Sequence, residues 1–160
     1  MTKTKKEFFL FQMILAALGI IALVLFLVLP VAYINNGIQD GGVNGISSIF
    51  GVVVSISGQA VTFSSVNGVG LTILILALLA SVLTGFMTKY GRGFLIVSSV
   101  LLLAAVILTC TYHTSWLFLN GGGQFPRPEW QCGGGQVTAA ALMIVQMIGN
   151  IVLFRLLKTK

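Results

Sequence analysis

The sequence predicts an all-α membrane protein: an antiparallel bundle of four transmembrane helices, with a small extracytoplasmic β-hairpin between the first two helices. Two observations support this prediction. The 160 residues are 57% hydrophobic and their mean hydropathy is positive, so the polar residues are too few to cover the surface of a soluble domain. The apolar residues also gather in four long runs, and no charged residue lies near the middle of any run.

The four runs have the length that a bilayer requires. A hydrocarbon core of about 30 Å is crossed by about 20 apolar residues in a helix, and the runs cover residues 8–29, 71–88, 94–116 and 137–157. Each central Leu, Ile, Val or Phe favours insertion by roughly 0.3 to 0.6 kcal/mol, whereas one central Lys would cost about 3 kcal/mol. We therefore expect a single four-pass membrane domain over residues 1–160, with outer loops at 30–70 and 117–136.

The basic residues predict the orientation. Only Arg127 lies on one side of the runs, and the other eight Lys and Arg residues lie on the opposite side: Lys3, Lys5, Lys6, Lys89, Arg92, Arg155, Lys158 and Lys160. The positive-inside rule then places both termini in the cytoplasm, and we expect the plasma membrane. Basic residues at helix ends bind anionic lipid headgroups, so the net charge of +6 predicts the lipid bilayer as partner and no nucleic acid.

The first run follows a basic start, as in a signal peptide. Its apolar stretch is too long for one, and Pro30 disrupts the small-residue cleavage site that would end at Ala32. We expect this run to be a retained helix.

The outer loop of residues 30–70 begins with turn signals and becomes rich in Val, Ile, Ser and Thr, a composition typical of strands. A two-residue turn at Gly58-Gln59 would make a hairpin in which Ile56 faces Val61. Its apolar face would consist of Val52, Val54, Ile56, Val61 and Phe63. Because an isolated hairpin is marginal in water, this face should rest on the bundle, on lipid or on a partner. A re-entrant loop over residues 46–56 is disfavoured, since backbone at membrane depth must be shielded.

The outer loop of residues 117–136 contains two Gly-Gly-Gly-Gln tetrads around a central octapeptide. Pro126 and Pro128 favour an extended, polyproline-like conformation there. It would display four candidates for partner contact: Phe125, Arg127, Glu129 and Trp130. The alternative is that the two aromatic residues are ordinary anchors at the membrane interface.

The chain offers few groups for catalysis. Its three acids, Glu7, Asp40 and Glu129, lie outside the middle of every run, whereas ion-coupled transporters usually place a carboxylate at the bilayer midplane. A single His113 without an acidic cluster does not make the metal site of an intramembrane protease. We therefore predict no enzyme, no cofactor and no metal.

Cys110 and Cys132 are candidates for a disulfide, which would close a loop of about 20 residues and stabilise the outer segment by roughly 3 kcal/mol in an oxidising exterior. With His113, three residues from Cys110, they could instead offer three metal ligands. The more common alternative is that the polar residues around His113 belong to the belt where a helix leaves the membrane.

Two features within the runs predict helix contacts. Small residues recur every four positions on the second run, a pattern that permits close helix approach: Ala77, Ser81 and Gly85. Gln146 and Asn150 place two amides on one face of the fourth run, where we expect them to bond to partners such as Gln12. These residues could pack within one bundle, or they could line a subunit seam or a narrow uncharged pore.

The topology resembles that of tetraspan junction proteins such as claudins. Residues 34–70, however, contain no Trp and no Cys, which the claudin signature requires, and the single Cys132-Gly133 does not match the Cys-Cys-Gly of tetraspanins. The sequence predicts a non-enzymatic accessory subunit that associates with itself or with a larger membrane-protein partner through the outer hairpin and loop. The alternatives are an oligomeric channel with an uncharged pore and, less favoured, a membrane redox or metal-dependent enzyme.

Overall fold

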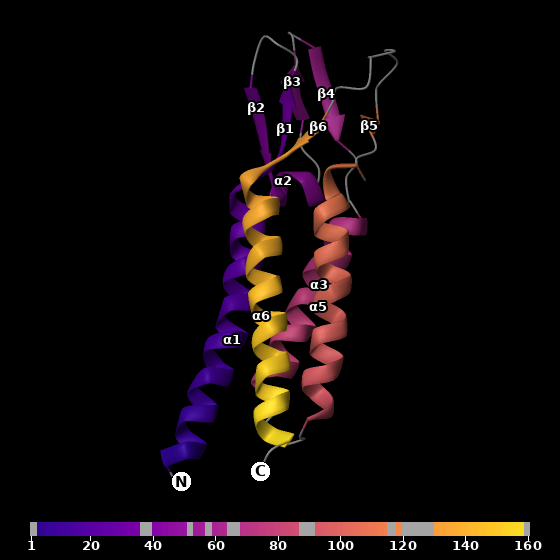
Figure 1. Cartoon of the computed structure of the whole chain (residues 1–160). Coiled ribbons are helices and arrows are strands. Elements are labelled where there is room, and N and C mark those ends of the chain that lie inside the picture. Colours follow the sequence, from indigo (N-terminus) through magenta and orange to yellow (C-terminus); the bar gives the residue numbers. More distant parts are fainter. Residues whose placement is uncertain are drawn as a thin grey trace.

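The computed structural model describes residues 3–35, 40–50, 53–56, 59–63, 68–86, 92–114, 118–119 and 130–158. In these residues, four long helices run alongside one another and short strands lie beyond one end of them (Figure 1). The helices are α1 (Lys3–Val28), α3 (Gly68–Gly85), α5 (Gly93–Thr111) and α6 (Gly134–Lys158). Each is long and apolar enough to cross a membrane by length and composition, so the predicted bundle of four long apolar helices is confirmed.

Each long helix packs against two neighbours: α1 and α5 do not form a major contact, and both pack on α3 and α6. Alanines let the helices approach closely in the interior, among them the buried Ala77, Ala80, Ala105 and Ala139. Large apolar side chains such as Ile14, Ile107 and Ile148 point outward and are about half exposed. So extensive an apolar surface is typical of a protein that lipid surrounds.

Both chain ends lie at the same end of the bundle (Figure 1). We call this the basic end, because the described Lys and Arg residues lie there, within the helices or directly before one: Lys3, Lys5, Lys6, Arg92, Arg155 and Lys158. We call the opposite end, where the strands are, the sheet end.

The helix ends differ from the predicted ones by a few residues. α1 begins at Lys3 and not at residue 8, so it includes the basic residues of the chain start. α5 ends at Thr111 and not at residue 116, because the chain tightens into the 3₁₀-helix η1 (Tyr112–Thr114), which turns Tyr112 into the protein interior.

The described strands form two antiparallel sheets, where the sequence predicts only one hairpin. The first sheet has the order β2-β1-β6, with β1 (Pro30–Asn35), β2 (Asp40–Asn44) and β6 (Trp130–Cys132). In it, β1 pairs with β6 from Ala32↔Cys132 to Ile34↔Trp130. This pairing connects the end of α1 to the start of α6.

The second sheet has the order β3-β4-β5, with β3 (Val53–Ile56), β4 (Gln59–Phe63) and β5 (Phe118–Leu119). It contains the predicted hairpin in a different register: Val54 pairs with Val61, and Ile56 with Gln59. Because Gln59 already pairs with Ile56, the predicted two-residue turn at Gly58-Gln59 is wrong. A shift of two residues leaves the same residues on each face, because strand side chains alternate with period two.

A short helix, α2 (Gly45–Phe50), lies between the bundle and the sheets (Figure 1). It packs on α1 and α3, and Ile49 is fully buried. The approach to α1 requires glycine, since a Cβ at Gly45 would lie 2.1 Å from the carbonyl oxygen of Phe26. The helix thus covers the end of the bundle.

Candidate functional site

Six buried polar side chains meet inside the bundle, in the half nearer the basic end. We call them the inner polar network: Gln12, Ser81, Thr84, Ser98, Gln146 and Asn150. They come from all four long helices. A polar group in a membrane interior is costly unless it is hydrogen-bonded. The hydrogen-bond partners of these six side chains therefore indicate the role of the cluster.

Three helices are joined at Asn150. Its Nδ2 donates to Thr84 Oγ1 at 3.1 Å and to Ser98 Oγ at 3.0 Å. The two hydroxyl oxygens lie 2.9 Å apart, and Ser98 Oγ also donates to the carbonyl oxygen of Ala80 at 2.8 Å. These bonds connect α6, α3 and α5 at one level of the bundle.

The first helix joins through Gln12, whose Nε2 donates to the carbonyl oxygens of Thr84 and Gly85, both at 2.7 Å. The sequence predicts Gln12 as a partner of Asn150, and the structure places both on Thr84 instead. Threonine can serve both, because its hydroxyl faces α6 while its carbonyl, near the last turn of α3, accepts from α1.

Gln146 makes a longer contact, from Nε2 to Ser81 Oγ at 3.4 Å. The amide fits against Gly19, where a Cβ would lie 2.0 Å from Ser81 Oγ and 2.3 Å from Gln146 Oε1. Sequence reasoning missed Gly19; a lone glycine in an apolar run is the signal that could have indicated a close helix contact. The stripe that begins at Ala77 and Ser81 is buried, whereas Gly85 is only half-buried, and a Cβ at Gly85 would lie 3.8 Å from the Ala16 Cβ.

A second polar cluster lies at the sheet end, where α5 meets β6 and α6. We call it the outer junction: Cys110, His113, Cys132 and Gln136. Gln136 Nε2 donates to the carbonyl oxygens of Thr109 and, at 3.0 Å, Cys110. It also lies 3.2 Å from His113 Nδ1, and Cys132 Sγ lies 3.2 Å from the same nitrogen. Sequence reasoning missed Gln136 and left it in the outer loop, whereas it lies in the first turn of α6, which begins at Gly134.

The two cysteines of the outer junction are free and exposed in the structure. The thiol of Cys132 contacts His113, and the disulfide with Cys110 stays a prediction. Although Cys132 is exposed overall, partial desolvation of its thiol, and secondarily the nearby Cys110, raise the pKa of this thiol, which disfavours the reactive thiolate. Among the described residues, no group of three or more His, Cys, Asp and Glu side chains is placed to hold a metal ion.

A third contact connects α2 to the end of α5. Ser48 Oγ and Tyr112 OH lie 2.8 Å apart, both buried, and the Tyr112 ring packs edge-on against Phe26 with centroids 5.2 Å apart. Burial raises the pKa of Tyr112 to about 12, and the bond from Ser48 offsets part of this shift. Residues of α1, α2 and η1 are thereby held together beneath the sheets.

The predicted partner-contact residues fall into separate parts of the sheet end. Val54 and Ile56 belong to β3, Val61 and Phe63 belong to β4, and Trp130 belongs to β6 of the other sheet. The remaining candidates lie outside the described residues: Val52, Phe125, Arg127 and Glu129.

Compared with protein-family models, with curated proteins and with solved structures, the chain shows no significant match. The two polar clusters hold helices, strands and η1 against one another. Their hydrogen bonds join one element to another, so the geometry supports a structural role for both.

Proposed function

We propose that this protein is a non-enzymatic subunit of the plasma membrane that associates with a copy of itself or with a larger membrane partner through its sheet end. The basic end would lie in the cytoplasm and the sheet end outside, as the positive-inside rule favours for basic residues that flank apolar helices. The sheets would then be presented to other proteins at the cell surface.

The observation on which this proposal rests is the edge of the second sheet. Strand β3 has the sequence Val-Val-Ser-Ile, and among the described strands it pairs only with β4. An edge strand presents unpaired backbone groups, and proteins that avoid edge pairing usually place Lys, Pro or a bulge there. β3 has neither Lys nor Pro, and its three β-branched apolar residues suit the addition of a further strand.

The interior of the bundle favours this role over the channel alternative. Gln12, Gln146 and Asn150 are fully buried within a single bundle, and their amide nitrogens bond to neighbouring helices. They therefore offer no polar stripe on the outside of the bundle, which a pore between subunits would need. Conductance of liposomes that contain the protein would support the channel instead.

The test is the mass of the protein in native nanodiscs, with co-purifying chains identified, for the wild type and two variants. Val54→Lys places a charge on the β3 edge and should dissociate the assembly to monomers. Gln131→Lys, the control, places the same charge on β6 of the other sheet and should leave the mass unchanged. A wild type that is monomeric without a partner, or a V54K variant that assembles normally, would contradict the proposal.

A further inference from the structure

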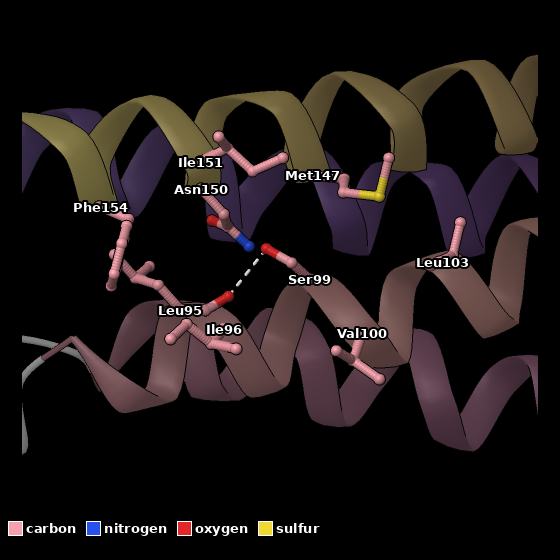
Figure 2. A pocket seen from close by; sticks show the side chains of 9 residues that line it. All are labelled: Leu95, Ile96, Ser99, Val100, Leu103, Met147, Asn150, Ile151 and Phe154. Carbon is pink, nitrogen blue, oxygen red and sulfur yellow. Dashed lines mark hydrogen bonds between the residues drawn. The ribbon is translucent and has the colours of Figure 1, made fainter.

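A groove lies between α5 and α6 on the outside of the bundle, with a volume of about 290 Å³. Figure 2 shows the facing side chains of the two helices, with Leu95, Ser99 and Leu103 on α5 opposite Met147, Asn150 and Phe154 on α6. Leu103 is 48% exposed and lies in a segment apolar enough to cross a membrane. The groove therefore opens toward the lipid.

The two polar residues of the groove are already bonded within the protein. Ser99 Oγ donates to the carbonyl oxygen of Leu95 in its own helix at 2.8 Å (Figure 2), and the Asn150 amide donates into the inner polar network. The remaining lining is hydrocarbon and sulfur of apolar side chains. The groove thus suits an apolar occupant and offers little to a polar substrate.

The dimensions match one hydrocarbon chain. From Leu95 to Leu103 the groove follows α5 for about 12 Å, at about 1.5 Å per residue. One leaflet of the hydrocarbon core is about 15 Å thick, half of the whole core. The volume also lies at the lower limit of pockets that take a small molecule, about 300 Å³.

Positive charge lies at one mouth of the groove. Arg92 precedes Ile96 by four residues, and Arg155 follows Ile151 by four, so both arginines continue the groove-lining faces of their helices at the basic end. Both are exposed, and Arg92 Nη2 donates to the carbonyl oxygen of Leu157, which holds its guanidinium between the two helix ends. Within the described residues, α5 and α6 contain no Asp or Glu to neutralise this charge.

We propose that the α5–α6 groove binds one anionic phospholipid, with an acyl chain between the helices and the phosphate on Arg92 and Arg155. Guanidinium groups bind phosphate oxygens through paired donors, and basic pockets between transmembrane helices are a recurring form of anionic lipid site. The occupant is a lipid of the leaflet at the basic end. This site is independent of the proposed role of the sheet end.

The test uses the full chain in nanodiscs of equimolar phosphatidylglycerol and phosphatidylcholine, released into native mass spectrometry to count the retained lipids. We expect the wild type to retain phosphatidylglycerol over phosphatidylcholine at least fivefold. The double variant Arg92→Gln/Arg155→Gln should lose this preference. Arg127→Gln, which removes one charge from an outer loop, should keep it.

A second pair of variants tests the acyl-chain part of the site. Val100→Trp fills the groove and should lower retention of both lipids at least fivefold. Val97→Trp places the same ring at a similarly exposed position of α5 that does not line the groove, and it should behave as the wild type. Equal retention by the V100W and V97W variants, or an unchanged preference in the double arginine variant, would overturn the proposal.

Discussion

The inner polar network and the outer junction use buried amides in different ways. In the network, Asn150 bonds to side chains of two other long helices, so helix is joined to helix. In the junction, Gln136 bonds to the last carbonyls of α5 and lies beside His113 of η1, so a helix is joined to the segment that leads into the sheets. The comparison indicates that the bundle and the sheet end are stabilised by separate contacts, which can be broken one at a time.

We expect the largest effect at the sheet end, from Gly133→Ala. A Cβ at Gly133 would lie 2.2 Å from the carbonyl oxygen of Pro30 and 2.5 Å from the carbonyl carbon of Val31. These are backbone atoms that cannot rotate away, so we expect a loss of about 3 kcal/mol, at the upper end for overpacking. Hydrogen exchange should show the loss as faster exchange in β1 and β6, while exchange in the middle of the long helices stays slow.

Gly134→Ala is the matched control, because, apart from its chain neighbours and the adjacent backbone of its own helix, no heavy atom lies within 4 Å of a Cβ at Gly134. Its stability should stay within about 0.5 kcal/mol of the wild type. If both variants lost the same stability, or if G133A opened the long helices as well, the two regions would not be independent.

The two regions also differ in how far the sequence predicts them. The amides of the inner polar network could be anticipated, because Gln146 and Asn150 are four residues apart on one long apolar run and must find partners in lipid. The partners themselves, Thr84 and Ser98, could not be chosen from the many hydroxyls in the runs without knowing how the helices are rotated.

At the sheet end, less could be predicted. The hairpin follows from alternating β-branched residues in one stretch of chain. Strand β2, with the sequence Asp-Gly-Gly-Val-Asn, has the composition of a turn, and β6 pairs with β1 from nearly 100 residues away in the chain. Local composition does not encode such a distant pairing, which is why the first sheet was not predicted.

Alanine substitutions at two adjacent serines of α5 should lower stability by different, smaller amounts. Ser98 Oγ bonds across to Ala80 and Asn150, whereas Ser99 Oγ bonds only within its own helix in the contacts described above, to Leu95. Ser98→Ala should therefore cost about 1 kcal/mol, typical of interhelical bonds in membranes, and Ser99→Ala close to zero. Unfolding in mixed micelles of increasing SDS content measures both, and equal midpoints would contradict a stabilising role of the inner polar network.

The smallest expected effect is a pH dependence of stability at the sheet end. Tyr112 there has a pKa of about 12, above its unfolded value of about 10. The folded protein therefore holds the phenol proton more strongly than the unfolded chain does. The resulting stability is complete below pH 10 and is lost as the pH rises from 10 toward 12. Tyr112→Phe, which lacks the bond to Ser48, should be less stable than the wild type by about 1 kcal/mol at pH 8.

By pH 11 the wild type should have lost about 1 kcal/mol through this group, so its stability should approach that of the Y112F variant. Ser48→Ala is the control, since it removes the same hydrogen bond and keeps the ionisable ring. This variant should be less stable than the wild type at pH 8, and its stability should still decline between pH 10 and 12. Melting curves at pH 8 and pH 11 measure the difference in stability between the wild type and Y112F. A difference that is the same at both pH values would mean that burial does not raise the pKa of Tyr112.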